Sequence, residues 1–301
     1  MKTAYLGTSD FAATVLRRLA ASPHRPGLVV TPPDRRQGRG RKVSPPPAAL
    51  AAAELGLDLL QAENVNDDAA LARIRAAQPE AVVVCAFGQL IREPLLSEYP
   101  MLNVHPSLLP RWRGAAPIER AIMARDQVTG VCVMQLTEGL DSGPVALCEE
   151  TPLDPGEDFG ALSARLADLG GDLLVRALDL QAEGALEFTE QDEDGVTYAE
   201  KIEPAERRLD PERPAAELAA QVRALTPHVG AYLELSDGAR LGVRQAVPVE
   251  GELDSGRLAE CDGALLLGTG EGALRLESVQ PAGGKPMPAD AYLRGHPLPG
   301  S

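Results

Sequence analysis

Short apolar runs alternate with Ala- and Leu-rich segments of helical spacing through the first half of the chain. The runs expected as strands are residues 2–6, 28–31, 57–61, 81–86 and 101–104. The segments expected as helices between them are residues 11–21, 47–55 and 67–77. This alternation is typical of βαβ units, in which helices cover both faces of a mostly parallel sheet. We therefore predict an α/β fold for this half of the chain.

The pattern changes in the second half. Strands at 129–136 and 145–151 and a helix at 159–181 complete the first region, and an acidic, turn-like stretch follows at 190–194. A short connecting strand at 196–202, a helix at 215–225 and strands at 231–235, 240–246, 264–267 and 273–279 come next. Short strands with Gly-containing turns favour a small, OB-like β-barrel. We predict a domain at residues 1–200 and a β-barrel domain at residues 201–301.

Several classes of protein are disfavoured. No apolar run approaches the roughly 20 residues that a membrane-spanning helix needs, so no membrane partner is expected. The first strand-to-helix turn, residues 7–11, lacks the Gly-x-Gly-x-x-Gly pattern of dinucleotide-dependent oxidoreductases. The four cysteines, which show no metal-ligand spacing, are Cys85, Cys132, Cys148 and Cys261. We expect buried free thiols in a reducing cytoplasm, and no bound metal.

The charge of the chain is unevenly distributed. The net charge is -15, yet residues 1–50 carry nine Lys and Arg against two Asp and Glu, whereas residues 149–200 carry two against fifteen. A local basic face can still meet a polyanion, because the local potential decides the encounter. The densest basic stretch, residues 34–42, holds Arg35, Arg36, Arg39, Arg41 and Lys42.

Three polar residues in two expected loops can support acyl transfer. Asn103 and His105 fall where a strand of the predicted sheet ends, which is the edge at which such sheets bind ligands. Asp141 lies in a Gly-flanked turn further along the chain. An amide and a protonated imidazole can stabilise an oxyanion, while a carboxylate can hold the imidazole charged and accept a proton. Taken alone, an Asn in a strand-end turn is commonly a backbone cap, and a His in a loop is commonly solvated.

The motif around these residues resembles the 10-formyltetrahydrofolate-dependent formyltransferases. It reads Asn103-Val104-His105-x-Ser107-Leu108-Leu109-Pro110, and its continuation at residues 111–118, Arg-Trp-Arg-Gly-Ala-Ala-Pro-Ile, is similar to that of the methionyl-tRNA formyltransferases. Further matches lie at residues 7–12, 33–40, 139–143, 197–202 and 280–283. The resemblance therefore covers both predicted domains, and it implies a Rossmann-like formyltransferase domain followed by a small β-barrel.

The resemblance implies the reaction and its residues. A formyl group would pass from 10-formyltetrahydrofolate, a co-substrate, to the α-amino group of methionine on charged initiator tRNA. The implied catalytic residues are Asn103, His105 and Asp141. The implied folate-binding residues are Val84, Ala86, Phe87, Gly88, Ser107, Leu108, Leu109 and Pro110. The implied tRNA-binding residues are Arg35, Arg36, Arg39, Arg41 and Lys42, with Lys201, Arg207 and Arg208 as weaker candidates. A monomer that acts in the cytoplasm is expected.

Three alternatives stay open from the sequence. A formyltransferase acting on a small amine, such as glycinamide ribonucleotide or an amino-sugar nucleotide, would share the three catalytic residues but generally lack the basic loop and the β-barrel. A hydrolase would release formate from the same folate to water. A catalytically silent RNA-binding protein would bind tRNA independently of folate.

Overall fold

The chain divides into two compact units. The computed structural model describes residues 1–37 and 42–296. Unit 1 comprises Met1–Gly114, Thr129–Thr151 and Ser163–Tyr198, and unit 2 comprises Ala115–Val128, Pro152–Leu162 and Ala199–Ser301. The boundary at residue 200 stays a prediction; the units show in addition that two earlier segments join the C-terminal part of the chain.

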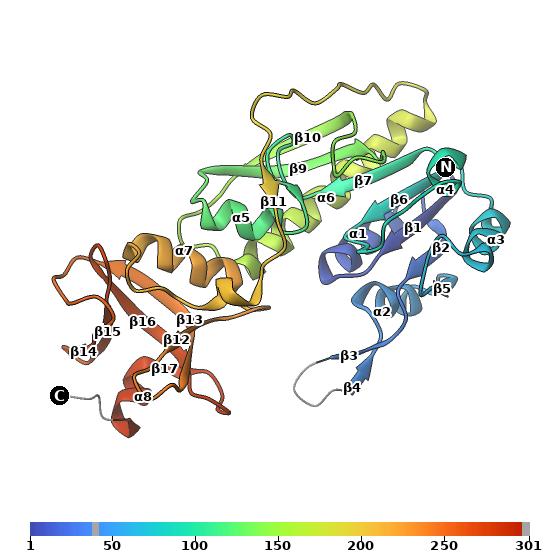
Figure 1. Cartoon of the computed structure of the whole chain (residues 1–301). Coiled ribbons are helices and arrows are strands. Elements are labelled where there is room, and N and C mark those ends of the chain that lie inside the picture. The colour runs from blue at the N-terminus through green and yellow to red at the C-terminus, as the bar shows by residue number, and fades with distance from the viewer. Residues whose placement is uncertain (38–41, 297–301) are drawn as a thin grey trace. The chain divides into compact units, whose positions relative to one another are not determined.

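Unit 1 is built on a seven-stranded sheet in the order β10-β9-β7-β6-β1-β2-β5 (Figure 1). Its strands are β1 (Thr3–Gly7), β2 (Pro26–Thr31), β5 (Leu59–Gln61), β6 (Ala81–Cys85), β7 (Met101–His105), β9 (Val128–Gln135) and β10 (Val145–Pro152). The five strands from β5 to β7 run parallel, and β9 is antiparallel to β7. The predicted α/β fold with a mostly parallel sheet is confirmed.

Helices cover both faces of this sheet. Successive side chains of a strand point to opposite faces, so Ala4 and Leu6 pack in a core cluster with α3 (Asp68–Ala77), whereas the Tyr5 hydroxyl donates to a carbonyl of α1 (Asp10–Ala20). Helix α1 begins where the Ser9 side chain accepts a hydrogen bond from the Ala12 N–H, as is typical of an N-cap. The remaining helices associated with this sheet are α2 (Pro47–Glu54), α4 (Leu95–Glu98) and α6 (Phe159–Ala182).

Helix α6 approaches the sheet closely at a glycine. A Cβ atom at Gly170 would lie 2.9 Å from Val104 and 3.1 Å from Val131, which is closer than an unstrained contact allows. Val104 of β7 therefore faces α6. Its neighbours Asn103 and His105 must face the opposite side of the sheet, because side chains alternate along a strand. This alternation positions the candidate site.

Unit 2 joins an antiparallel sheet to several helices. The sheet order is β12-β13-β16-β15-β14, with β17 beside β16. Its strands are β12 (Ala231–Glu234), β13 (Arg240–Val249), β14 (Leu258–Cys261), β15 (Ala264–Gly268), β16 (Ala273–Gln280) and β17 (Met287–Pro288). The helices are α5 (Pro117–Met123), the 3-10 helix η1 (Pro204–Arg207), α7 (Ala215–Leu225) and α8 (Ala289–Gly295). Leu and Val side chains of α7, β13 and β16 form the core.

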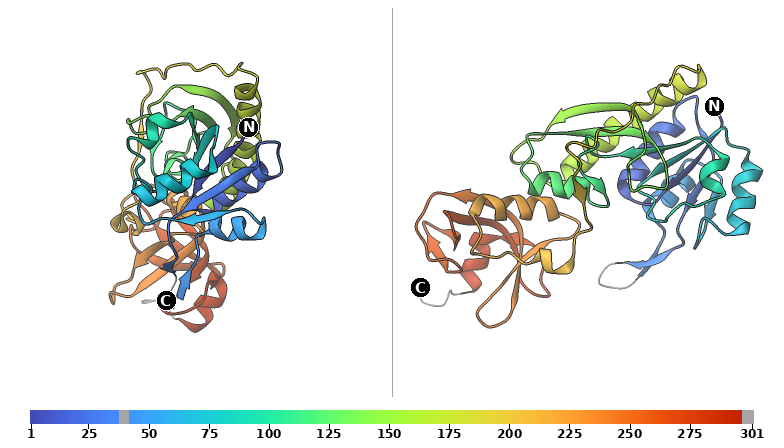
Figure 2. Two further views of the ribbon diagram at one scale, coloured as in Figure 1. Left: turned by 90° about the vertical axis from the view of Figure 1, so that its right-hand side faces the viewer. Right: turned by 45° about the horizontal axis from the view of Figure 1, so that its top comes forward.

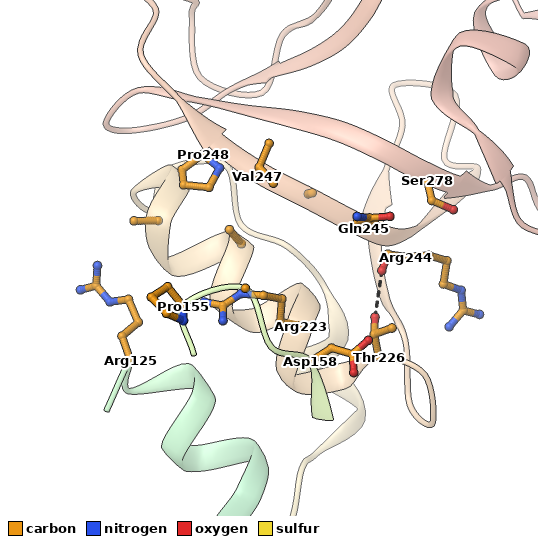
Figure 3. A pocket seen from close by; sticks show the side chains of 14 residues that line it. Arg125, Pro155, Asp158, Arg223, Thr226, Arg244, Gln245, Val247, Pro248 and Ser278 are labelled. Atoms are coloured by element: carbon orange, nitrogen blue, oxygen red, sulfur yellow. Dashed lines mark hydrogen bonds between the residues drawn. The ribbon is translucent and has the colours of Figure 1, made fainter. Parts of the chain in front are cut away.

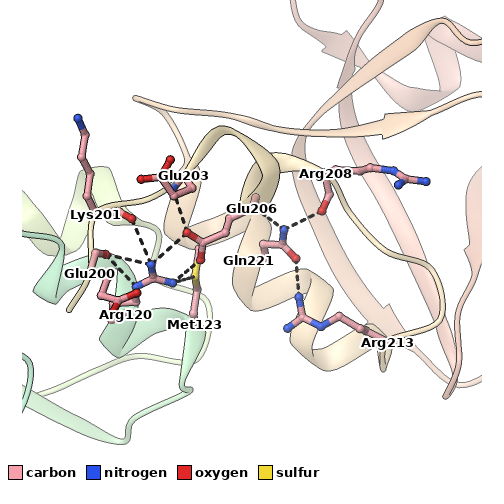
Figure 4. Close-up of polar contacts among 9 residues, drawn as sticks. All are labelled: Arg120, Met123, Glu200, Lys201, Glu203, Glu206, Arg208, Arg213 and Gln221. Atoms are coloured by element: carbon pink, nitrogen blue, oxygen red, sulfur yellow. Dashed lines mark hydrogen bonds and ion pairs between the residues drawn. The ribbon is translucent and has the colours of Figure 1, made fainter. Parts of the chain in front are cut away.

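A polar network ties α5 to the segment that begins the C-terminal part of the chain (Figure 4). Arg120 of α5 forms an ion pair with Glu206 of η1, and its guanidinium donates to the Glu200 carbonyl at 2.9 and 3.1 Å. Gln221 of α7 donates to the carbonyls of Glu206 and Arg208 at 2.7 and 3.1 Å. The Arg120 guanidinium holds the pKa of the Glu206 carboxyl below its usual range, although burial acts in the opposite direction.

We expect Arg120→Met to lower the free energy of unfolding at pH 7. The loss should be about 1–2 kcal/mol, below the value for a fully buried pair, because water still reaches Glu206. Since the folded-state pKa of Glu206 is lowered, the ion pair stabilises the protein above the unfolded pKa of glutamate, about 4.3, and this contribution is lost as the pH falls through the lowered value. Urea unfolding at pH 7 and at pH 3 measures both effects.

Arg17→Met provides the control, because Arg17 and Glu54 form an exposed ion pair in unit 1. Its effect should be small at both pH values. An Arg120→Met variant as stable as the wild type at pH 7 would contradict the assignment.

The prediction of four buried free thiols is wrong for three of the cysteines. Cys132 of β9 and Cys148 of β10 form a disulfide across adjacent strands, and Cys261 is exposed. Only Cys85, among the described residues, is a buried free thiol, and burial raises its pKa to about 12. Sequence spacing could not reveal the pair, because strand pairing rather than proximity in the chain brings Cys132 and Cys148 together.

Candidate active site

Strand β7 supplies two of the predicted catalytic side chains. Asn103 and His105 are two residues apart and therefore share one face of the strand. They are 8% and 4% exposed, which is unusual for such polar side chains. The strand is one residue longer than predicted, so His105 is its last residue rather than the first residue of a loop.

The third predicted side chain reaches this face from the loop after β9. Gln135, the last residue of β9, pairs with Leu102 near the start of β7, because the two strands are antiparallel. The loop must therefore return along β7 to bring Asp141 to Asn103 and His105. The backbone of Asp141 is left-handed, with φ 45°, a conformation that Asp adopts more readily than most residues.

The Asp141 carboxylate contacts both partners. Its Oδ1 accepts a hydrogen bond from Asn103 Nδ2 at 3.3 Å, and its Oδ2 lies 3.7 Å from His105 Nδ1. Oδ2 also accepts the Gly114 N–H at 2.9 Å. The structure thus brings the three predicted side chains together; their catalytic roles stay predictions.

A backbone carbonyl determines the orientation of the imidazole. His105 Nε2 lies 2.9 Å from the carbonyl oxygen of Trp112, which can only accept, so Nε2 carries a hydrogen. The Nδ1 atom is then the nitrogen that faces Asp141. Trp112 has φ 63°, an outlier for so bulky a residue, and this conformation aims its carbonyl at His105.

The first group of predicted folate-binding residues, within residues 84–88, lies at the C-terminal end of β6, on the same edge of the sheet. Val84 and Phe87 are buried, and the Phe87 side chain belongs to the core. Ala86 and Gly88 are exposed and left-handed, with φ 43° and 76°. A ligand at this edge would meet mainly backbone groups of Ala86 and Gly88. The binding role of all four stays a prediction.

The second group follows β7. The Ser107 hydroxyl is buried and donates to the Arg111 carbonyl at 2.7 Å, which stabilises the turn. Leu108 packs against Gly130 of β9, where a Cβ atom would collide with it. Leu109 and Pro110 are partly exposed and remain available to a ligand. Two members of this group therefore also support the fold of the loop.

The predicted basic loop is a β-hairpin at its base. Strands β3 (Arg35–Gln37) and β4 (Lys42–Ser44) pair antiparallel and extend from the sheet of unit 1 (Figures 1 and 2). Arg35 and Arg36 are exposed. Lys42 begins β4, and Arg39 and Arg41 lie outside the described residues.

The weaker RNA-contact candidates belong to unit 2. Lys201 is exposed. Arg207 donates to the Gly230 carbonyl at 3.1 Å, and Arg208 forms an ion pair with Glu234 at 3.4 Å. Both arginines therefore have a partner within the unit.

Two side chains missed as site residues come from the connection before β11 (Tyr198–Ala199). Gln191 donates to the carbonyls of Asp141 and Gly143 at 2.8 and 2.7 Å, and Thr197 accepts the Trp112 N–H at 2.9 Å. Gln191 lies in the acidic stretch interpreted as a turn, which carried no catalytic signal. Thr197 is part of a family-like motif, but that motif does not indicate its contact.

Unit 2 has a cavity of its own, of about 520 Å³, between α7, β13 and residues 155–158 (Figure 3). Arg223 lies in its wall and donates to the Glu157 carbonyl at 3.3 Å, and burial lowers its pKa. Asp158 in the same wall accepts the Ala161 N–H at the start of α6. None of the predicted catalytic or folate-binding residues lines this cavity.

Within residues 1–37 and 42–296, no group of three or more His, Cys, Asp or Glu side chains is placed to hold a metal ion. Over the same residues, no helix combines the length and the apolar character needed to cross a bilayer.

Comparison with known proteins assigns the family. A family model described as formyl transferase matches residues 1–178. The chain belongs to the formyl transferase family. A second model of this family, the formyl transferase C-terminal domain, matches residues 201–297. The resemblance based on the motif at residues 103–118 is confirmed.

Curated relatives of this formyl transferase match along nearly the whole chain. The methionyl-tRNA formyltransferase of Methylobacillus flagellatus is 43% identical over 301 residues, which cover 99% of this chain and 97% of the relative. That of Parvibaculum lavamentivorans is 42% identical, with 99% and 98% covered. The resemblance to this branch of the family is therefore confirmed at high identity.

Solved structures share the fold. HypX from Aquifex aeolicus in complex with tetrahydrofolic acid aligns with a TM-score of 0.67 at 18% identity, over 97% of this formyl transferase and 47% of that chain. An N-formyltransferase from Helicobacter canadensis, in complex with folinic acid and dTDP-3-aminofucose, aligns with a TM-score of 0.68 at 12% identity, over 92% and 98%. At such low identity these likenesses support the fold alone.

Proposed function

We propose that this formyl transferase moves the formyl group of 10-formyltetrahydrofolate to the α-amino group of methionine on charged initiator tRNA, as needed for translation initiation. The observation that carries the chemistry is the meeting of Asn103, His105 and Asp141 on one face of β7. The proposed acceptor, charged tRNA, is supported by the curated relatives. These are named methionyl-tRNA formyltransferases, and this chain matches them over nearly their whole length.

The three side chains divide the reaction between them. The α-amino nitrogen attacks the formyl carbon, so a new C–N bond forms and negative charge develops on the formyl oxygen. Asn103 Nδ2 and a protonated His105 Nδ1 donate to this oxyanion, the kind of contact that lowers such barriers most. Asp141, whose Oδ2 lies 3.7 Å from His105 Nδ1, takes the proton that the amine releases. Breaking the bond to N10 then returns that proton to N10, and no enzyme group becomes covalently attached.

The folate would lie along the ends of β6 and β7. Backbone groups near Val84, Ala86, Phe87 and Gly88 would contact its pteridine ring, and residues 107–110 would line the other side. The exposed left-handed turn at Ala86 and Gly88 supports this placement, because it leaves backbone groups open to a ligand. The reaction requires no metal.

One assay tests the proposed function. The protein is incubated with 10-formyltetrahydrofolate and one of three acceptors: Met-charged initiator tRNA, an amino-sugar nucleotide, or water alone. Formyl-methionine should form with the charged tRNA, with slower formylation of the sugar and little release of formate. Equal or faster formylation of the small amine, or formate release independent of any acceptor, would contradict the proposal.

The tRNA acceptor would be held by the basic stretch of residues 34–42, through Arg35, Arg36, Arg39, Arg41 and Lys42. Such phosphate contacts position a nucleic acid and make its binding depend on salt. The exposure of Arg35 and Arg36 supports this role.

We expect Arg39→Ala to raise the KM for charged tRNA and leave the KM for folate nearly unchanged. Each lost phosphate contact should reduce the slope of log affinity against log salt by about 0.7–0.9. Steady-state kinetics at several salt concentrations measures both. Arg73→Ala, which removes an exposed arginine paired with Asp58, is the matched control. An unchanged dependence of the rate on tRNA concentration would contradict the proposal that this basic stretch binds tRNA.

We further propose that the protein works as a monomer in the cytoplasm. All three catalytic candidates come from one chain, which supports a complete site in a single copy. Sedimentation equilibrium of the full chain tests the oligomeric state.

A further inference from the structure

We propose that Gln191 and Thr197 are positioning residues, which together hold Asp141 and His105 in reactive geometry. This inference rests on the proposed function, because it concerns the same reaction. Both residues belong to the segment of residues 191–197, called here the brace, in the extended connection between α6 and β11 (Figure 1). Gln191 contacts the backbone carbonyl of Asp141, whereas Thr197 reaches His105 through the backbone of Trp112.

Gln191 holds the loop that carries Asp141. Its amide nitrogen donates both hydrogens, to the Asp141 carbonyl at 2.8 Å and to the Gly143 carbonyl at 2.7 Å. Its amide oxygen accepts the Arg113 Nε–H at 2.9 Å, and Arg113 is only 7% exposed. The amide therefore has partners on both donor positions and on its acceptor. Because these three hydrogen bonds form together only in one arrangement, they favour a single position of the loop that carries Asp141.

The loop needs such a restraint. Asp141 has a left-handed backbone, a conformation that costs roughly 1–3 kcal/mol for a residue other than glycine and persists where surrounding contacts impose it. Gly143 presses on β9 so closely that a Cβ atom would lie 2.0 Å from the Gln135 carbonyl oxygen. The loop is thus pinned beside β9 at Gly143, and Gln191 extends the restraint to Asp141.

Thr197 holds the other partner through Trp112. The Thr197 hydroxyl oxygen accepts the Trp112 N–H at 2.9 Å, and its carbonyl accepts the Arg113 N–H at the same distance. Trp112 is itself left-handed, and its carbonyl accepts the hydrogen of His105 Nε2. The chain of contacts from Thr197 to His105 therefore selects the ring nitrogen that faces Asp141.

Gln191 and Thr197, the two halves of the brace, together determine the distance between Asp141 Oδ2 and His105 Nδ1. Gln191 positions Asp141, Thr197 positions His105, and the two side chains face each other at 3.7 Å. A misplacement of about 1 Å at a reacting group can cost roughly 100-fold in rate. Loosening either half should therefore slow the reaction and leave the binding of both substrates largely intact.

The test compares Gln191→Leu and Thr197→Val with the conservative Thr197→Ser and with Glu190→Leu, a change at an exposed neighbouring position. We expect kcat to fall about 10–100-fold in Gln191→Leu and about 10-fold in Thr197→Val, with KM values within about twofold of the wild type. Thr197→Ser, which keeps the hydroxyl, should restore most of the activity, and Glu190→Leu should have none of these effects. The pH profile of kcat should change in Gln191→Leu and Thr197→Val, which a loss of folded protein alone would not cause.

A second measurement does not depend on turnover. In ¹⁵N NMR spectra, wild-type His105 should carry its hydrogen on Nε2 when neutral, and Thr197→Val should populate both tautomers. If Gln191→Leu and Thr197→Val kept the kcat, the pH profile and the His105 tautomer of the wild type, the proposed positioning role of the brace would be wrong. A wild-type protein that forms no formyl-methionine would instead overturn the proposed function, so the two failures are distinguishable.

Discussion

Asp141→Asn is expected to reduce formyl transfer about 10³-fold or more while tRNA and folate still bind. General-base catalysis contributes about 10²–10⁴-fold, and the Asp141 carboxylate also faces His105 Nδ1 at 3.7 Å. Asparagine has the same shape as aspartate and keeps an oxygen that can accept the Gly114 N–H. It also tolerates the left-handed backbone at this position. Single-turnover formylation of charged initiator tRNA, together with filter binding of the same tRNA, separates chemistry from affinity.

Glu138→Gln is the control for this experiment. It neutralises an exposed carboxylate in the same loop and should leave both rate and affinity unchanged. Full turnover by Asp141→Asn would disprove the proton-transfer role, whereas a parallel loss of tRNA binding would indicate that the loop has a different task.

Asn103→Leu should have the second largest effect. Removal of a single preorganised oxyanion donor costs about 10²–10³-fold in kcat. The leucine is similar in volume, and the site is buried in β7, so the strand should persist. The Asp141 carboxylate loses one hydrogen bond in addition, which adds to the defect. The expected result is a fall in kcat with KM for folate changed little, measured by steady-state kinetics at saturating tRNA.

A packing control separates this effect from disturbance of the strand. Met134 of β9 lies opposite Asn103 in the sheet, and Met134→Leu changes the packing beside Asn103 without removing a donor. It should retain nearly wild-type kcat. An Asn103→Leu variant with the activity of Met134→Leu would exclude Asn103 as an oxyanion donor.

Local pattern was sufficient to predict most of the fold. The strands around the site were predicted to within about two residues, because buried parallel strands form continuous apolar runs. Helix α7 begins and ends at the predicted residues, Ala215 and Leu225. Short elements were missed: α5 follows a proline-rich motif, and the partly exposed β14 carries no continuous apolar run. Such elements are stabilised chiefly by tertiary packing, which local sequence does not encode.

The catalytic candidates could be proposed from the sequence, but the residues that hold them in position could not. Asn103 and His105 are two residues apart in the chain and belong to one motif, so the sequence suggests both at once. The contact between Gln191 and Asp141 joins residues 50 positions apart through a backbone carbonyl, which places no requirement on the type of residue it belongs to. The disulfide between Cys132 and Cys148 likewise depends on strand pairing. Interactions of this kind become visible only when the chain is folded.

The interleaving of the two units limits how this chain can be divided. Helix α5 lies between β7 and β9 of the α/β sheet in sequence, yet it packs on α7 and forms an ion pair with Glu206 through Arg120, all within unit 2. A cut near residue 200 would separate α5 from its packing partner and leave both fragments with an uncovered apolar face. Exchange of the C-terminal part between relatives should therefore succeed only when residues 115–128 and 152–162 are exchanged with it.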